Sequence, residues 1–210
     1  MPIDVIVADI GNVTFSQAEK YLGYVSALRR DRIAKKRCDE DKLLSLAAGL
    51  LLSRELSRRS GIPTDKLRYR HGSFGKPYLI GSELQFSLSH TKGAVCVAFS
   101  DSGEVGADIE RLSRRVSRRI YDRVLSDNEK QRVHSSEDLI RLWVQKEAFL
   151  KRLGTGIAAD LRGADTDLIC STVEYDCGEY AVGVSGNGAQ TAQISRITVS
   201  ELLDSLGGLK

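Results

Sequence analysis

The sequence lacks a long apolar run, a fixed-period repeat and a low-complexity linker, and these absences narrow what the protein can be. The longest apolar stretches, such as residues 50–52, are far too short to cross a membrane, so we expect no membrane partner. The first residues hold no basic segment followed by an apolar stretch, so we also expect no secretion signal.

Cysteine and histidine are scarce and are not arranged for bridges or metal binding. The four cysteines are Cys38, Cys96, Cys170 and Cys177; they form no CxxC pair, and no histidine lies near the last two. A disulfide framework or a zinc site is therefore not expected, and reduced thiols in a cytoplasm are the simpler interpretation. The 210 residues, 28% charged and 41% hydrophobic, suit one large or two small globular domains.

Excess charge is also small. A net charge of +3 does not indicate a global polyanion binder, so no nucleic-acid partner is expected. Basic residues nevertheless gather in two runs, namely Arg29, Arg30, Arg32, Lys35, Lys36 and Arg37, and then Arg111, Arg114, Arg115, Arg118, Arg119 and Arg123. Each run alone can be a solvated helix face, whereas the two together favour acidic partners or phosphates.

Periodicity predicts an α+β fold. The predicted strands are 3–9, 84–88, 94–100, 104–110, and, towards the end, 168–175, 179–185 and 190–197; the predicted helices are 17–29, 39–59, 137–153 and a last short one. The turn at 101–103 predicts a hairpin between the strands that flank it, and Ser126 with Glu129 predicts a capping box. This order indicates two lobes that meet near residue 104.

Two acids share one face of a predicted strand. Because side chains alternate along a strand, Asp108 and Glu110 in the sequence VGADIE point to the same side. The pair is either a solvated strand end or part of a cation site. A set of carboxylates is what Mg²⁺ binds while it keeps several waters and shares its shell with substrate phosphates.

The predicted helix 137–153 carries a second group of charges. Glu147 and Lys151 stand four residues apart and so face each other, either as an ordinary surface pair or as one wall of a site. Lys146 falls within the apolar stripe of this helix, where an ammonium is costly unless it reaches an anion or extends to solvent.

Two further segments are compatible with phosphate binding. Ser89 and His90 end a predicted strand, and they offer hydroxyl and imidazole donors, although a histidine in a turn is the ordinary alternative. The Gly72–Pro77 loop has glycines that let the backbone approach a ligand, or it is simply a flexible loop with an exposed Lys76.

Together these motifs resemble the Sfp-type 4′-phosphopantetheinyl transferase superfamily, in its WxxKEA variant. The matching motifs are FGKP at 74–77, FSLSH at 86–90, VGADIE at 105–110 and WVQKEAFLK at 143–151, within a matching stretch of roughly residues 29–157. The resemblance implies a pseudo-dimer of two similar α+β lobes, each a small, mostly antiparallel sheet with helices. These lobes would be residues 1–104 and 105–210, with the active site in the cleft between them.

The resemblance also implies roles for single residues. The implied metal ligands for Mg²⁺ or Mn²⁺ are Asp108, Glu110 and Glu147, and the implied catalytic residues are Glu147, Lys151 and Asp108. The implied coenzyme A-binding residues are Arg29, Arg32, Gly75, Lys76, Pro77, Ser89, His90, Lys146 and Lys151, with Ser45 in a looser match. Glu129 matches a carboxylate that helps to position the site.

The implied reaction transfers 4′-phosphopantetheine from coenzyme A to a serine of an apo acyl or peptidyl carrier protein and releases adenosine 3′,5′-bisphosphate. The alternatives are a Mg²⁺-dependent nucleotide pyrophosphate hydrolase and a non-catalytic coenzyme A-binding module. We expect Glu147 to take the serine proton, either directly or through a metal-bound water. Lys151 is expected to stabilise the leaving phosphate, with Lys146 or Lys76 assisting, and Arg114 and Arg118 to steer an acidic carrier. A monomer is expected.

Overall fold

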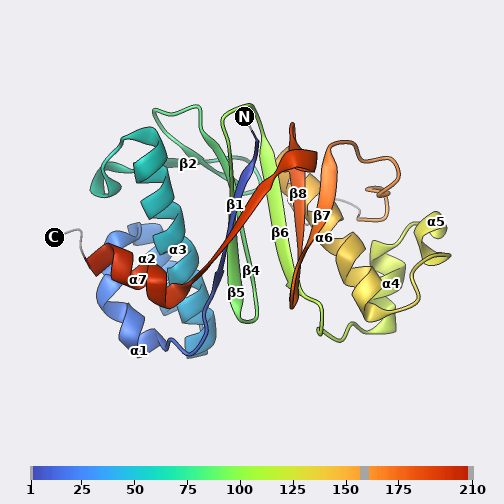
Figure 1. Cartoon of the computed structure of the whole chain (residues 1–210), viewed down its shortest axis with the longest axis horizontal. Coiled ribbons are helices and arrows are strands. Elements are labelled where there is room, and N and C mark those ends of the chain that lie inside the picture. The colour runs from blue at the N-terminus through green and yellow to red at the C-terminus, as the bar shows by residue number, and fades with distance from the viewer. Residues whose placement is uncertain (1, 157–160, 208–210) are drawn as a thin grey trace.

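The computed structural model describes residues 2–156 and 161–207, which form a mixed α+β fold (Figure 1). The helices are α1 Phe15–Ala18, α2 Ala27–Ala34, α3 Asp39–Ser60, α4 Arg118–Val124, α5 Asp127–Lys130, α6 Ser136–Leu153 and α7 Val199–Gly207, with 3-10 turns η1 Glu19–Tyr24, η2 Thr64–Lys66 and η3 Ala189–Thr191. The strands are β1 Asp4–Asp9, β2 Tyr69–His71, β3 Pro77–Leu79, β4 Gln85–Thr91, β5 Ala94–Ser100, β6 Val105–Arg111, β7 Thr172–Cys177, β8 Tyr180–Gly186 and β9 Gln193–Thr198.

The strands form two main sheets and a short ribbon. The first sheet has the order β4-β5-β1-β9, in which β1 runs antiparallel to β5 and parallel to β9. The second sheet, β6-β8-β7, is fully antiparallel, and β2 pairs with β3 in the ribbon. The prediction of small, mostly antiparallel sheets with helices is therefore confirmed.

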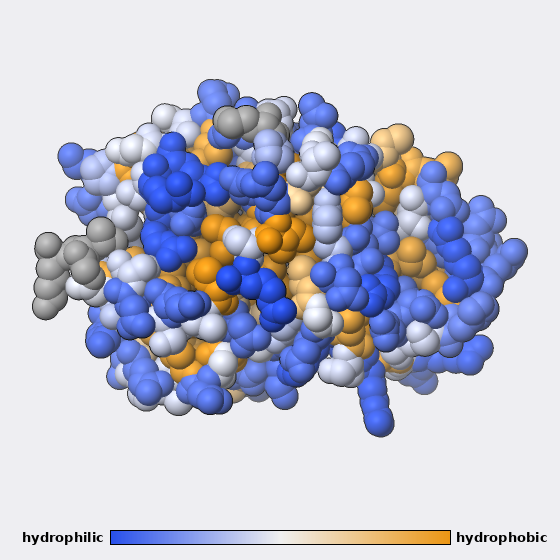
Figure 2. Space-filling model, viewed as in Figure 1, coloured by the Kyte–Doolittle hydropathy of each residue, from blue (hydrophilic) through white to orange (hydrophobic). Residues whose placement is uncertain are grey.

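The two sheets lie between helices and share a core. The long helix α3 covers one face of the first sheet, and α6 lies against the second sheet (Figure 1). Between the sheets, Val5 and Val7 of β1 belong to the same buried cluster as Val182 and Val184 of β8. Figure 2 shows hydrophilic side chains over most of one face, including the end with α4 and α5, with apolar patches between them.

The boundaries of the two long helices follow local sequence signals. A capping box formed by Ser135 and Asp138 precedes α6, which ends at Gly154 with φ +68°. Helix α3 ends at Gly61 in the same left-handed conformation. Glycine is the residue that adopts this conformation at least cost. The predicted ends of both helices are confirmed to within a residue. The capping box of Ser126 and Glu129 is also present.

Two local predictions are wrong. The predicted helix 17–29 is divided into α1, η1 and α2, because Val25 and Ser26 are extended and the Ser26 side chain starts α2 by accepting the Arg29 N–H. The predicted hairpin around 101–103 does not form, since β5 is already paired on both edges, with β4 and with β1. Residues 101–104 instead carry the chain from the first sheet to the second.

The end of the chain returns to the first sheet. Strand β9 pairs with β1, and α7 places Leu202 in the core around α3. The division into lobes 1–104 and 105–210 stays a prediction. In the structure, residues 193–207 pack with the first sheet and with the core around α3. None of the described helices is long and apolar enough to cross a membrane.

Candidate functional site

Hydroxyl side chains of β4 face the acids of β6. Ser89 Oγ donates to Asp108 at 2.6 Å, and Thr91 Oγ1 donates to Glu110 at 2.8 Å. Ser87 Oγ accepts the backbone N–H of Ala107 at 3.0 Å. Because alternate residues of a strand share a face, three polar residues at a spacing of two can join the two sheets here. Asp108 and Glu110 are thereby held on one side of β6, as the sequence predicts.

Lys151 of α6 completes a three-way contact with Asp108 and Ser89. Its Nζ donates to Asp108 Oδ1 at 2.6 Å and to Ser89 Oγ at 2.8 Å. The Asp108 side chain is 8% exposed and that of Lys151 is 29% exposed, so this ion pair is screened less than a surface pair. The structure therefore brings together three of the predicted residues from β4, β6 and α6.

Glu147 lies one turn before Lys151 and is buried. Burial raises its pKa, the charges of Asp108 and Glu110 raise it further, and Lys151 acts in the opposite direction. The pKa of Glu110 is raised by burial and by Asp108, although Thr91 and Arg114 oppose the shift. The three acids are thus close enough to destabilise one another's negative charge.

This electrostatic strain suits a divalent cation, which would favour the charged form of all three acids. Asp108, Glu110 and Glu147 offer only oxygen ligands, as Mg²⁺ and Mn²⁺ prefer. Within residues 2–156 and 161–207, however, no three His, Cys, Asp or Glu side chains converge as a ready-made metal cage. The residues fit such an ion by charge and chemistry, and their role as ligands stays a prediction.

Glu110 also has a basic partner that the sequence reasoning did not assign to it. The Arg114 guanidinium pairs with Glu110 Oε1, and its Cζ lies 5.5 Å from the centre of the Trp143 ring. Arg114 is predicted to steer a carrier protein; its pairing with Glu110 has no sequence signal, because a spacing of four residues brings side chains together on a helix, and Glu110 lies in β6. The spacing of Ser87, Ser89 and Thr91 indicates that the three share one face of β4, but it does not identify β6 as the element that they contact.

His90 of β4 has several basic residues near it. Partial desolvation lowers its pKa, and the charges of Lys36, Lys151 and Arg29 lower it further. Arg29, from a distant part of the sequence, and Lys151 are thus both close enough to act on His90, and their positive charges favour a negatively charged group there.

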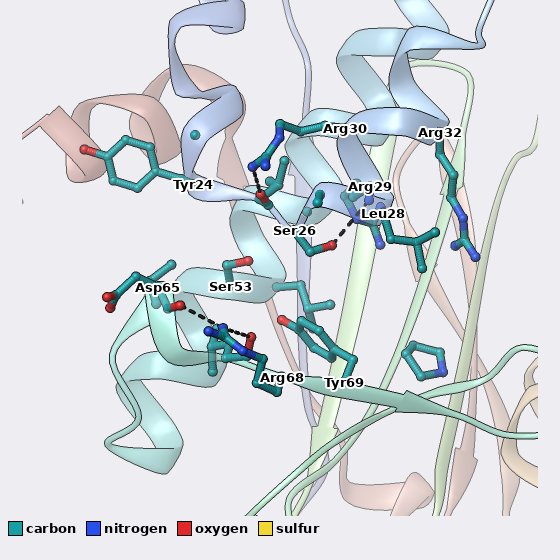
Figure 3. A pocket seen from close by; sticks show the side chains of 18 of the residues that line it. Tyr24, Ser26, Leu28, Arg29, Arg30, Arg32, Ser53, Asp65, Arg68 and Tyr69 are labelled. Atoms are coloured by element: carbon teal, nitrogen blue, oxygen red, sulfur yellow. Dashed lines mark hydrogen bonds between the residues drawn. The ribbon is translucent and has the colours of Figure 1, made fainter.

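A pocket of about 1020 Å³ adjoins α2, α3 and β2. Figure 3 shows Leu28, Arg29 and Arg32 projecting from α2 on one side, with Arg68 and Tyr69 on the other. Arg29 Nη1 donates to the Ser45 carbonyl at 3.2 Å, and burial followed by the charge of Arg32 lowers the pKa of Arg29.

The pocket collects some of the predicted coenzyme A residues. Arg29, Arg32 and Pro77 line it, whereas Ser89, His90 and Lys151 do not. Gly75 lies in an exposed turn with φ +86°, and it is not part of the lining either.

Lys76 is directed towards backbone carbonyls rather than towards the acids. Its Nζ donates to the Arg152 carbonyl at 2.9 Å and to the Val105 carbonyl at 3.2 Å. Burial lowers the pKa of this ammonium. Lys76 therefore joins the β2–β3 ribbon to the start of β6 and the end of α6.

Lys146 lies apart from Lys151, in a closed polar site. Its Nζ donates to Glu129 at 2.5 Å, to the Val124 carbonyl at 2.7 Å and to the Leu161 carbonyl at 2.9 Å. Both side chains of the ion pair are 0% exposed. The structure does not bring Lys146 to Asp108, Glu110 or Glu147. The anion that compensates its charge in these apolar surroundings is Glu129.

Glu129 is held from several directions. Burial acts to raise its pKa, but hydrogen bonds from Lys146, Thr166 and Ser126 outweigh burial, so the pKa is lowered. The ion pair thus fixes α5 and the segment at 161–166 against α6, the helix that also carries Glu147.

The comparisons with known proteins point to one family. The family model of the 4′-phosphopantetheinyl transferase superfamily matches residues 104–190, which include β6 and α6. The chain is 27% identical over 150 residues to 4′-phosphopantetheinyl transferase Sfp of Bacillus subtilis. The aligned residues cover 68% of this chain and 66% of that protein. It is 34% identical over 131 residues to 4′-phosphopantetheinyl transferase AcpT of Salmonella typhi, and the aligned residues cover 59% of this chain and 64% of that protein.

A third relative is 4′-phosphopantetheinyl transferase gsp of Aneurinibacillus migulanus, 29% identical over 124 residues, with 56% of this chain and 51% of that protein covered. The chain thus spans about half to two thirds of the length of the relatives it matches. With these likenesses, the chain is similar to the 4′-phosphopantetheinyl transferase superfamily over the part that holds β6 and α6.

Proposed function

We propose that this protein transfers the 4′-phosphopantetheine group from coenzyme A to a serine hydroxyl of an apo acyl or peptidyl carrier protein. The observation that carries the proposal is the contact of Lys151 with Asp108 and Ser89 beside the buried Glu147. This arrangement places a donor for phosphate oxygens next to acids that a cation would stabilise. The names of the relatives support the same reaction.

In the proposed reaction, the serine oxygen bonds to the phosphorus that carries pantetheine. The bond from that phosphorus to the bridging oxygen breaks, and adenosine 3′,5′-bisphosphate leaves. Glu147 accepts the serine proton, and because a bound cation would favour its charged form, it acts as a modest base. Lys151 turns from Asp108 to the leaving phosphate and stabilises the charge that develops there. Mg²⁺ or Mn²⁺, bound by Asp108, Glu110 and Glu147, would supply neutralisation of the pyrophosphate charge.

We further propose that coenzyme A extends from these acids past His90 towards the pocket beside α2. The positive charges of Lys151 and Arg29 near His90 support this path for the phosphates. Arg32 and Pro77 line the pocket, where the nucleotide would lie. Gly75 would contribute through its backbone, since it has no side chain.

The two-lobe arrangement is part of the same proposal. In it, the first sheet and the second sheet are the cores of two similar lobes, and the acids of β6 lie in a cleft between them. Contacts from β4 to β6 support this, because they join the two sheets beside Asp108 and Glu110. A monomer in the cytoplasm, with neither a membrane nor a nucleic-acid partner, stays the expected state.

Mass measurement of a carrier protein tests the reaction directly. The purified chain is incubated with coenzyme A, Mg²⁺ and a panel of apo carrier proteins, and each carrier is weighed. We expect a gain of one phosphopantetheine, and a loss of roughly 100-fold or more in kcat for Glu147→Gln, the scale of general base catalysis.

No gain on any carrier would contradict transferase activity. Release of free phosphopantetheine would favour the hydrolase, and tight coenzyme A binding without turnover would favour the binding module. Near-native turnover of Glu147→Gln at saturating Mg²⁺ would remove Glu147 from the proposed roles.

The same assay tests steering by the basic segment, with one change required by the structure. Arg114 pairs with Glu110, so charge reversal at Arg114 would disturb a proposed metal ligand as well. Arg115 and Arg118 are exposed and suit the test better. Arg115→Glu with Arg118→Glu should raise KM for an acidic carrier and leave KM for coenzyme A unchanged; equal weakening of both substrates would reject steering.

A further inference from the structure

The contact between Arg114 and Glu110 sets up a competition for one carboxylate. Glu110 Oε1 already pairs with the Arg114 guanidinium, and Oε2 accepts the hydroxyl of Thr91. A divalent cation at Oε1 would stand next to the positive guanidinium. Two cations at that separation repel each other, and they do so more strongly near a protein surface than in bulk water. Cation binding by Glu110 and the ion pair with Arg114 therefore oppose each other.

Arg114 is free to give way, whereas Glu110 is not. The side chain of Arg114 is 43% exposed and that of Glu110 is 15% exposed. Arg114 follows β6 in the connection to α4, where its backbone N–H donates to the Arg111 carbonyl. Glu110 is fixed within β6, which pairs with β8. Displacement would thus move the guanidinium outwards to the surface that holds Arg115 and Arg118.

We propose that Arg114 is a positioning residue that couples cation binding at Glu110 to docking of the carrier protein. The inference rests on the proposed function and adds that cation binding promotes docking of the carrier. Without a cation, Arg114 neutralises Glu110. When a cation takes Oε1, the displaced guanidinium adds its charge to the basic surface that an acidic carrier would meet. By linkage, the cation and the carrier each strengthen the binding of the other by the same factor.

Trp143 provides a built-in reporter for this movement. It is the single tryptophan of the sequence, and the guanidinium of Arg114 lies over its ring. A cation near the face of an indole interacts with its π system, so displacement of Arg114 changes the surroundings of the ring. Tryptophan emission therefore follows Arg114 without any need for turnover.

The test compares Arg114→Gln with Arg115→Gln, a matched loss of one positive charge at the adjacent residue. Mn²⁺ is titrated in the presence of coenzyme A and followed by electron paramagnetic resonance, with coenzyme A alone as the blank. We expect Arg114→Gln to bind Mn²⁺ roughly fivefold tighter than the wild type, at the lower end of typical coupling factors. Arg115→Gln should match the wild type.

Emission and carrier binding supply the other readouts. Mg²⁺ should change Trp143 emission in the wild type and in Arg115→Gln, and leave it unchanged in Arg114→Gln. Arg114→Lys should restore part of the change. Mg²⁺ should also tighten apo-carrier binding roughly fivefold in the wild type and not in Arg114→Gln.

Unchanged Mn²⁺ affinity in Arg114→Gln, or an emission change that persists in it, would overturn the inference. Failure of Mn²⁺ to bind the wild type would overturn it too. These measurements do not depend on transfer. The proposed function is judged separately by the mass of the carrier. If the protein modifies carriers and Arg114→Gln behaves as the wild type, only the proposed coupling is rejected.

Discussion

Two lysines on one helix, Lys146 and Lys151, have opposite environments, and helix geometry explains why. Lys151 follows Glu147 by four residues and so shares its side of α6. Lys146 precedes Glu147 by one residue, which turns its side chain by about 100° around the axis. Glu129 and two backbone carbonyls enclose Lys146, whereas Lys151 contacts Asp108 and Ser89. A motif that contains both lysines does not by itself say which one faces the acids.

Lys76 gives a residue-scale prediction. Replacing it with Met removes the donor for the Val105 and Arg152 carbonyls, and a partly buried carbonyl without a partner is costly. We expect Lys76→Met to lower the free energy of unfolding by about 1–3 kcal/mol, the cost of such a lost partner. KM for coenzyme A should change little. Urea unfolding and steady-state kinetics measure the two effects.

Arg32→Ala is the comparison for this test, because Arg32 lines the pocket beside α2 and is exposed. It should raise KM for coenzyme A and leave unfolding unchanged. The reverse pattern, a raised KM with native stability in Lys76→Met, would show that Lys76 binds coenzyme A as the sequence motif predicts.

At the scale of elements, β6 and α6 approach so closely that only glycine fits between them. A Cβ at Gly106 would stand 1.9 Å from the Ala148 carbonyl oxygen, and one at Gly183 of β8 would stand 2.0 Å from the Val144 carbonyl oxygen. Both obstacles are backbone atoms of α6 and cannot rotate away. This contact sets the distance between Asp108 on β6 and Glu147 with Lys151 on α6.

Gly106→Ala should therefore separate the strand from the helix. We expect the free energy of unfolding to fall by about 3 kcal/mol, the upper part of the usual range for overpacking. We also expect kcat to fall in the folded fraction, because Asp108 would move relative to α6. Urea unfolding and the carrier assay check both effects. Gly23→Ala is the control, since nothing lies within 4 Å of its added Cβ; equal stability of the two variants would contradict the close contact.

The elements differ in how far the sequence could predict them. The capped ends of α3 and α6, and the positions of β4, β5 and β6, follow from local spacing and were predicted. The partners of those strands were not, because pairing depends on residues far apart in the chain. The turn at 101–103 fits a hairpin locally, yet β1 from the start of the chain occupies the edge of β5 that the hairpin would need.

The candidate site shows the same limit. Asp108, Glu147 and Lys151 are identifiable by motif, and the structure brings them together. The partners Thr91 for Glu110 and Glu129 for Lys146 became visible only with the tertiary contacts between β4 and β6 and between α5 and α6. Spacing within one strand or helix indicates which side chains share a face, but not which other element covers that face.

At the scale of the whole molecule, the last described strand pairs with the first. Strand β9 lies parallel to β1, and Leu202 of α7 is fully buried in the core around α3. The second sheet is therefore inserted between segments that belong to the first sheet. Its inner face shares a buried cluster with β1. Neither sheet can separate without exposing that cluster, so we infer that the two halves unfold together.

Leu202→Ala tests this inference, because Trp143 of α6 reports on the opposite half of the molecule from α7. Truncation of a buried leucine costs about 2–5 kcal/mol. If unfolding is cooperative, circular dichroism and Trp143 emission should shift to the same lower urea midpoint. Leu168→Ala, at a side chain that is 77% exposed, should shift neither signal. A Trp143 midpoint that stays native in Leu202→Ala, while the dichroism midpoint falls, would mean that the half with α6 unfolds independently of the first sheet.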